Sequence, residues 1–172
     1  MSQHWRSLWA SAAASLAGLA MLANVALARA ESLPSLPLAI AVTELFVVDD
    51  LSGVALYGFD PVSYFLPDGA KPGLAEYEVV WSGVAWRFAS AANREAFVRD
   101  PEVYAPRFGG YDAGAVARGL TVRASPWLSV VRADGLYLFR NDHERARFVA
   151  DASIAEKAVG RWAGLKSGLV QP

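Results

Sequence analysis

The stretch WLSVVRADGLYLF, residues 127–139, decides the fold class of this chain. It contains two β-rich runs, 127–131 and 136–139, on either side of Asp134-Gly135. An Asp-Gly pair between two such runs favours the tight turn of a β-hairpin. We therefore expect two antiparallel strands here.

A second hairpin is expected earlier, where residues 77–81 and 84–88 are separated by Ser82-Gly83. Helix-start residues, chiefly Asp and Ser before apolar runs, predict short helices around the two hairpins. The expected helical segments are 62–66, 91–99, a turn after Asp100-Pro101, 111–118, and 144–150 continuing to 162. Short strands mixed with short helices, without regular βαβ alternation, predict an α+β fold. No internal repeat is expected.

Residues 1–30 have the plan of a secretory signal peptide. A weakly positive start precedes an uncharged, alanine-rich run, Leu8 to Ala28, and Ala28-Arg29-Ala30 offers small residues to a signal peptidase. We expect cleavage near Ala30 and a periplasmic or secreted mature protein. The run is about long enough to cross a bilayer, so an uncleaved anchor is the alternative and the one expected route to membrane contact.

Four segments follow from this organisation: a signal peptide over 1–30, a linker and first element over 31–50, one domain over 51–165 and a C-terminal tail over 166–172. Residues 31–37, ESLPSLP, carry two prolines and two serines, a composition typical of a linker. The apolar, β-branched residues 40–48 predict either a first strand or a short helix.

The composition of the mature chain disfavours several kinds of partner. Loss of Arg6 and Arg29 with the signal peptide leaves 14 basic and 17 acidic residues, a net charge of −3. A mildly acidic domain has no electrostatic reason to bind nucleic acid. The mature chain has no Cys, no Met and a single histidine, His143. Zinc and copper(I), which prefer thiolate, thioether and imidazole ligands, are therefore disfavoured, and no cofactor is expected.

Three further stretches are GFDPVSYF (58–65), WRFASAANREAF (86–97) and DPEVYAPRFGGYDA (100–113). In this order they resemble the YHS-domain family, and most of all its exported bacterial branch, some members of which carry selenocysteine. The resemblance runs from about Val54 to Trp162. It implies a metal-associated module with a cysteine or selenocysteine after the tyrosine that follows the double glycine. This chain has Asp112 at that position, and Phe88-Ala89-Ser90 also lacks a cysteine common in the wider family.

The candidate site consists of Asp60, Tyr64, Tyr111 and Asp112. One hypothesis is a shallow pocket for a small polar ligand or a partner, derived from a metal or thiol site. The alternative for the two aspartates is structural, because each stands before an expected helix and a carboxylate there accepts free backbone N–H groups.

We expect an exported YHS-like module that binds an unknown small ligand or envelope protein without catalysing a reaction. Two alternatives stay open. One is a hard-metal-binding protein or an enzyme that uses Asp112 as ligand or general base, with Asp60 and Asp112 the only metal candidates. The other is a structural envelope protein that acts through surface contacts. Ser63 and Ser90 lack an accompanying His-Asp signature, so nucleophilic catalysis has no support.

Overall fold

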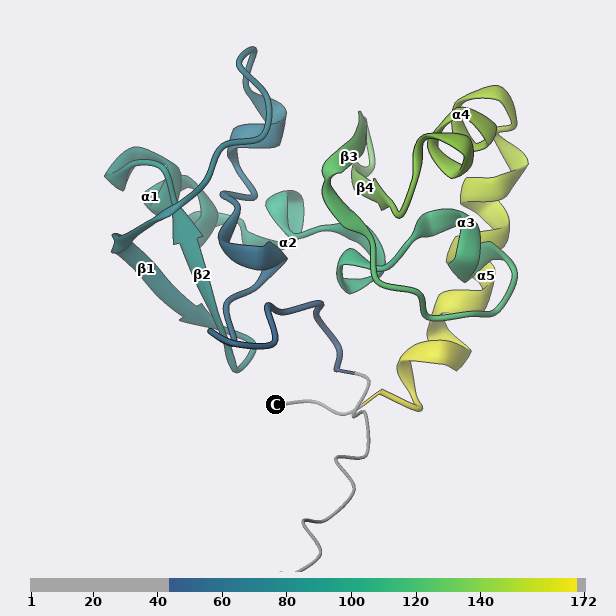
Figure 1. Cartoon of the computed structure of the whole chain (residues 1–172), viewed down its shortest axis with the longest axis horizontal. Coiled ribbons are helices and arrows are strands. Elements are labelled where there is room, and N and C mark those ends of the chain that lie inside the picture. Colours follow the sequence, from purple (N-terminus) through teal and green to yellow (C-terminus); the bar gives the residue numbers. More distant parts are fainter. Residues whose placement is uncertain (1–43, 170–172) are drawn as a thin grey trace, which may run out of the picture. The chain divides into compact units, whose positions relative to one another are not determined.

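A computed structural model describes residues 44–169 of the chain (Figure 1). It contains five α-helices and two separate antiparallel β-hairpins, so the predicted α+β fold class is confirmed. The expected signal peptide, the linker up to residue 43 and the last three residues of the tail lie outside the described part. Among residues 44–169 no helix is both long and apolar enough to cross a membrane.

The first hairpin pairs β1 (Leu74–Trp81) with β2 (Val84–Phe88), as the β-rich runs predict. Strand β1 contains a bulge between Leu74 and Glu78. Helix α1 (Ala91–Arg99) follows directly, and the Ser90 hydroxyl accepts the N–H of Asn93 at its start. This N-terminal cap satisfies one of the backbone donors that a helix leaves unpaired.

The second hairpin pairs β3 (Ser125–Arg132) with β4 (Gly135–Phe139) and has a bulge between Ser125 and Ser129. Helix α4 (Asp142–Ala150) follows, and the Asn141 side chain accepts the N–H of Glu144 as its cap. The remaining elements connect or cover these units. They are the 3₁₀ turns η1 (Leu56–Gly58), η2 (Ser63–Phe65) and η3 (Arg107–Gly110), and the helices α2 (Pro101–Tyr104), α3 (Ala113–Ala117) and α5 (Ser153–Lys166).

The two hairpin–helix units are structural repeats of one another. Elements β3, β4 and α4 each begin 51 residues after β1, β2 and α1, and the paired elements have equal lengths of 8, 5 and 9 residues. Their bulges fall at equivalent positions. The expectation that the chain has no internal repeat is therefore wrong. The repeat escaped detection because the halves share element lengths and central aromatic positions but few identical residues.

A turn with unusual backbone geometry precedes each unit and belongs to the repeat. The φ angles of Leu56, Tyr57 and Gly58 are 53°, 55° and 82°. Those of residues 108–110 are 58°, 63° and 89°. Three consecutive residues in the left-handed region are uncommon, since this region is strained for residues other than glycine. Their recurrence shows that the two halves are built on the same backbone plan.

Each half has its own hydrophobic cluster, with equivalent aromatic residues at its centre. The central residues, all at most 1% exposed, are Trp86, Phe88 and Phe97 in the first half and Tyr137, Phe139 and Phe148 in the second. Phe88 and Phe97 have ring centroids 5.1 Å apart, and the equivalent pair Phe139 and Phe148 lies at 5.0 Å. Each helix therefore packs against its hairpin through the same contact.

Two local expectations differ from the structure. Residues 44–48 form neither a strand nor a helix, but an irregular segment whose Val48 makes an isolated bridge to Ala55. The segment is apolar because Phe46 and Val47 are buried against the two hydrophobic clusters. The last helical stretch is divided into α4 and α5 at Asp151, whose carboxylate accepts the Ser153 N–H and so begins a new helix.

Candidate functional site

Asp60 is fully buried and holds the turn before the first hairpin to the end of that hairpin. Its Oδ1 accepts the backbone N–H groups of Val62 and Ser63, at 2.8 and 3.3 Å. Its Oδ2 accepts the Ala89 N–H at 2.9 Å and the Asn93 side-chain amide at 2.5 Å. A carboxylate offers about four acceptor positions, so these four donors leave none for a ligand.

Asp112 has the equivalent structural role in the second half, where it holds the start of α3 to the end of the second hairpin. It is fully buried, and its Oδ1 accepts the Ala115 N–H at 2.6 Å as the cap of α3. Its Oδ2 accepts the N–H of Arg140 at 2.7 Å. Arg140 follows β4 directly, as Ala89 follows β2. The structural alternative for Asp112 is therefore confirmed: it is the repeat counterpart of Asp60.

The two tyrosines of the predicted site connect segments that are far apart in sequence. The Tyr64 hydroxyl donates to the carbonyl of Pro126 at 2.7 Å, and the Tyr111 hydroxyl donates to the carbonyl of Glu44 at 2.5 Å. Burial raises the pKa of both phenols, and the charge of Asp60 raises the pKa of Tyr64 further. Both hydroxyls therefore stay protonated and act as hydrogen-bond donors.

The predicted shallow pocket around Asp60, Tyr64, Tyr111 and Asp112 is thus not what the structure shows. All four residues are buried, and their polar atoms bind the protein's own backbone, with the Asn93 amide as a further partner of Asp60. Asp60 and Asp112 are correspondingly poor metal ligands, which corrects their assignment as metal candidates. Within residues 44–169 no group of three or more His, Asp or Glu side chains is placed to hold a metal ion.

A second buried carboxylate of this half, Glu144, lies close to Asp112 across Gly114. It accepts two hydrogen bonds from the Arg118 guanidinium, both 3.1 Å long, and its side chain is 7% exposed. Gly114 separates the two carboxylates, and a Cβ at this position would lie 2.3 Å from Glu144 Oε2. The hydrogen bonds from Arg118 hold the pKa of Glu144 below its usual value, against the opposing effect of burial.

This lowered pKa predicts loss of stability in acid. A carboxyl whose pKa is depressed by folding contributes stability above its unfolded pKa, near 4.5, and loses it as the pH falls through its folded pKa. We expect Glu144→Gln to be less stable than the wild type at about pH 6. This difference in the free energy of unfolding, measured by urea titration, should shrink as the pH is lowered to about 3. The exposed control Glu156→Gln should differ little from wild type at either pH. A constant Glu144→Gln deficit would contradict the prediction.

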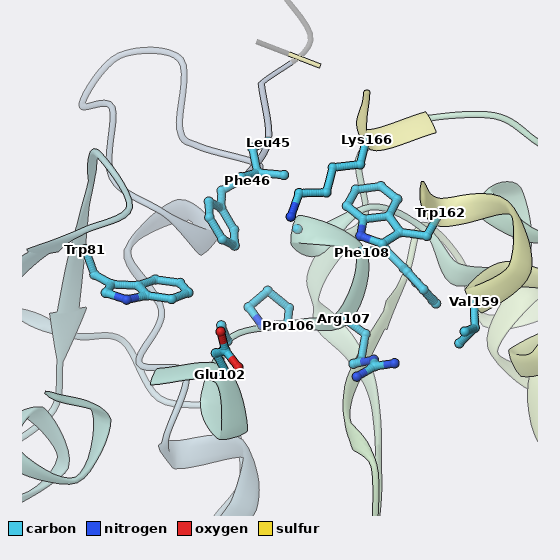
Figure 2. Close-up of a pocket in the computed structure, with 12 residues that line it drawn as sticks. Leu45, Phe46, Trp81, Glu102, Pro106, Arg107, Phe108, Val159, Trp162 and Lys166 are labelled. Carbon is cyan, nitrogen blue, oxygen red and sulfur yellow. The ribbon is translucent and has the colours of Figure 1, made fainter. Parts of the chain in front are cut away.

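A cleft of about 320 Å³ combines aromatic and charged side chains, and none of the four predicted site residues lines it; it is our candidate for a binding site (Figure 2). Its volume is at the lower end of the range for small-molecule pockets, roughly 300–1,000 Å³. The residues that line it come from the segment before the first repeat, from β1, from the connection between the repeats and from α5. They are Leu45, Phe46, Trp81, Glu102, Ala105, Pro106, Arg107, Phe108, Gly109, Val159, Trp162 and Lys166.

The aromatic walls of the cleft are anchored in both hydrophobic clusters. Phe46 packs edge-on against Trp86 at 5.2 Å between ring centroids and lies 5.5 Å from Trp81. Trp162 of α5 packs on Phe108 at 5.6 Å. Rings held in this way lose little freedom when a ligand binds, which favours affinity. Figure 2 shows Phe46 and Trp81 on one side of the cleft and Trp162 with Phe108 on the other.

Three charged side chains border the cleft: Glu102, Arg107 and Lys166. None of them forms an ion pair with another residue in the described part of the chain. The stem of Arg107 lies over Gly135, where an added Cβ would be 3.0 Å from the Arg107 Cδ. Sequence reasoning missed the cleft because its lining is assembled from distant parts of the chain. Residues 102–109 belong to the quoted stretch 100–113, whereas Phe46, Trp81 and Trp162 lie far from it in sequence.

Comparisons with known proteins found no matching family model, no matching curated protein and no matching solved structure. The resemblance to the YHS-domain family therefore stays a prediction. The functional interpretation has to rest on the cleft and on the chemistry of the residues around it.

Proposed function

We propose that the mature chain is an exported, YHS-like binding module without catalytic activity, and that it binds a small ligand in the cleft of Figure 2. The observation that carries this proposal is the combination of fixed aromatic walls with three charged groups that have no ion-pair partner in the described residues. Pockets that bind small molecules combine an apolar lining with a few such polar groups.

The absence of catalysis is inferred from what surrounds the reactive side chains. A general base needs a free lone pair within reach of its substrate, but the carboxylates of Asp60 and Asp112 are buried and bound to backbone N–H groups. The Ser63 hydroxyl donates to the Asp60 carbonyl and accepts the Lys71 N–H. His143 is exposed on α4 and does not line the cleft.

Export is supported by the signal-peptide pattern of residues 1–30. A module that acts in the periplasm or outside the cell meets small molecules that cross the outer layers of the cell. The retained YHS-like motifs, with Asp112 serving as a cap, fit a scaffold that has lost thiol chemistry and kept its fold.

The test separates the cleft from the aspartate network. The protein, purified from periplasm after expression of the full-length precursor, is screened by thermal shift against small molecules of anionic, cationic, zwitterionic and neutral classes. We expect at least one class to raise the melting temperature of the wild type and to lose this effect in Lys166→Gln or Arg107→Gln. Asp112→Asn should lower the melting temperature without ligand and still respond to the same compounds.

Elemental mass spectrometry of the same preparations tests the hard-metal alternative. Near-stoichiometric metal in the wild type that disappears in Asp112→Asn would contradict the proposal and restore the hard-metal alternative. Charged compounds that stabilise the wild type, Lys166→Gln and Arg107→Gln equally would show that these compounds bind outside the cleft.

A further inference from the structure

We propose that the cleft selects aromatic monoanions, that is, planar ring compounds with one carboxylate or sulfonate group. This inference rests on the proposed function and adds the chemical class of the ligand. It is drawn from three properties of the cleft: its aromatic walls, its excess of positive charge and the position of its single carboxylate.

The aromatic walls suit a flat ring. Trp81 and Phe46 line one side of the cleft, and Trp162 lines the opposite side (Figure 2). Aromatic pairs at centroid distances of about 4.5–7 Å gain roughly 0.5–1.5 kcal/mol beyond the burial of their area. A planar ligand between these side chains can stack on one ring and meet another edge-on. A flexible aliphatic chain of the same volume gains no such contacts and loses more conformational freedom on binding.

The charged residues favour an anion. Arg107 and Lys166 bring two positive charges to the cleft, against one negative charge from Glu102. The Lys166 amino group reaches between the rings of Phe46 and Trp162 (Figure 2). A guanidinium group can donate two parallel hydrogen bonds to a carboxylate or sulfonate. The Arg107 stem lies over Gly135, and its guanidinium group has no ion-pair partner among residues 44–169.

Glu102 restricts the ligand to a single negative charge. It lies on the Trp81 side of the cleft, whereas Lys166 and Trp162 lie on the other side (Figure 2). A ligand with a second anionic group would bring that charge towards Glu102, which would repel it. Glu102 also distinguishes this proposal from its nearest competitor, a zwitterion such as an aromatic amino acid, whose ammonium group would pair with Glu102.

The experiment uses four indole compounds that differ in charge: indole-3-acetate, indole-3-acetamide, tryptamine and tryptophan. Binding to the mature protein is measured by isothermal titration calorimetry. We expect indole-3-acetate to bind roughly tenfold more tightly than the neutral acetamide, since hydrogen bonds to charged groups are about twice as strong as neutral ones. Tryptamine should bind most weakly.

Three variants test the contribution of each charge. Lys166→Gln and Arg107→Gln should each weaken indole-3-acetate binding by roughly five- to tenfold, and their affinity for the neutral acetamide should change little. Lys157→Gln, on the same helix α5 but outside the cleft, is the matched control and should bind as the wild type does. Glu102→Gln should strengthen binding of indole-3-acetate, because it removes the repulsion between two negative charges.

Each contrary result has its own meaning. Equal affinity for indole-3-acetate and its amide would overturn the anion selectivity and leave the binding module intact. Tighter binding of tryptophan that is lost in Glu102→Gln would replace the monoanion by a zwitterion. If no indole compound binds and no compound of the wider screen stabilises the protein, both the ligand class and the proposed function are wrong.

Discussion

Replacement of Asp60 by asparagine is expected to lower the free energy of unfolding by about 3–5 kcal/mol, near the upper end of single-residue effects. The asparagine amide keeps one acceptor oxygen and turns an NH₂ group towards donors that Asp60 now satisfies. Whichever way it is oriented, either the Val62 and Ser63 N–H groups or the Ala89 N–H group lose their partner in a buried site. An unsatisfied buried donor costs about 1–3 kcal/mol.

The control for this prediction is Asp68→Asn, which has the same chemistry on the surface. The Asp68 side chain is 73% exposed and pairs with Lys71 at 2.7 Å. An exposed pair of this kind contributes at most about 1 kcal/mol. Urea unfolding of both variants, followed by tryptophan fluorescence, measures the difference. If Asp60→Asn were no more destabilising than Asp68→Asn, Asp60 would not be the structural anchor described above, and a functional role would have to be reconsidered.

Replacement of Gly109 by alanine is expected to be at least as severe, with a loss of about 4 kcal/mol or more. A Cβ at this position would lie 1.9 Å from the backbone oxygen of Leu45, so the backbone of one segment must move. The Val47 N–H also donates to the Gly109 carbonyl at 2.7 Å, which holds the two segments together. The residue additionally has a φ of +63°, which is strained for alanine.

Gly58→Ala separates the clash from the backbone strain. Gly58 has a φ of +82°, but no atom lies within 4 Å of the position that a Cβ would occupy. Only the strain of the left-handed region should apply, about 1–2 kcal/mol. Equal losses in the two variants, measured by the same urea titration, would show that contact with Leu45 is not what requires glycine at position 109.

The Gly109 contact also links stability to the proposed binding site. Leu45 and Phe46 form one wall of the cleft, and Gly109 lies in its lining. The repeat explains why glycine is required in one half only. The equivalent position in the first half is Tyr57, which has nearly the same φ of 55° and carries a full side chain. The second half needs glycine because residues 44–47 pass directly over its turn.

The local part of the fold could be predicted from the sequence. The hairpin over 127–139 follows from an Asp-Gly turn between β-rich runs, and the caps at Ser90 and Asp112 follow from polar side chains before helices. These features depend on residues within a few positions of one another, so their hydrogen bonds can be inferred from spacing alone. Spacing alone left two alternatives open for Asp112, a helix cap or a functional carboxylate, and the structure shows the cap.

The internal repeat and the cleft were decided by tertiary structure. The halves share backbone geometry and buried aromatic positions, while the side chains between these positions differ, so the repeat is visible in structure and hidden in sequence. The cleft depends on long-range packing that brings Phe46, Trp81 and Trp162 together from three distant segments. Sequence determined the elements, because turns and caps are short-range. Only the packed structure decided which polar groups are buried and satisfied, and which charges remain available to a ligand.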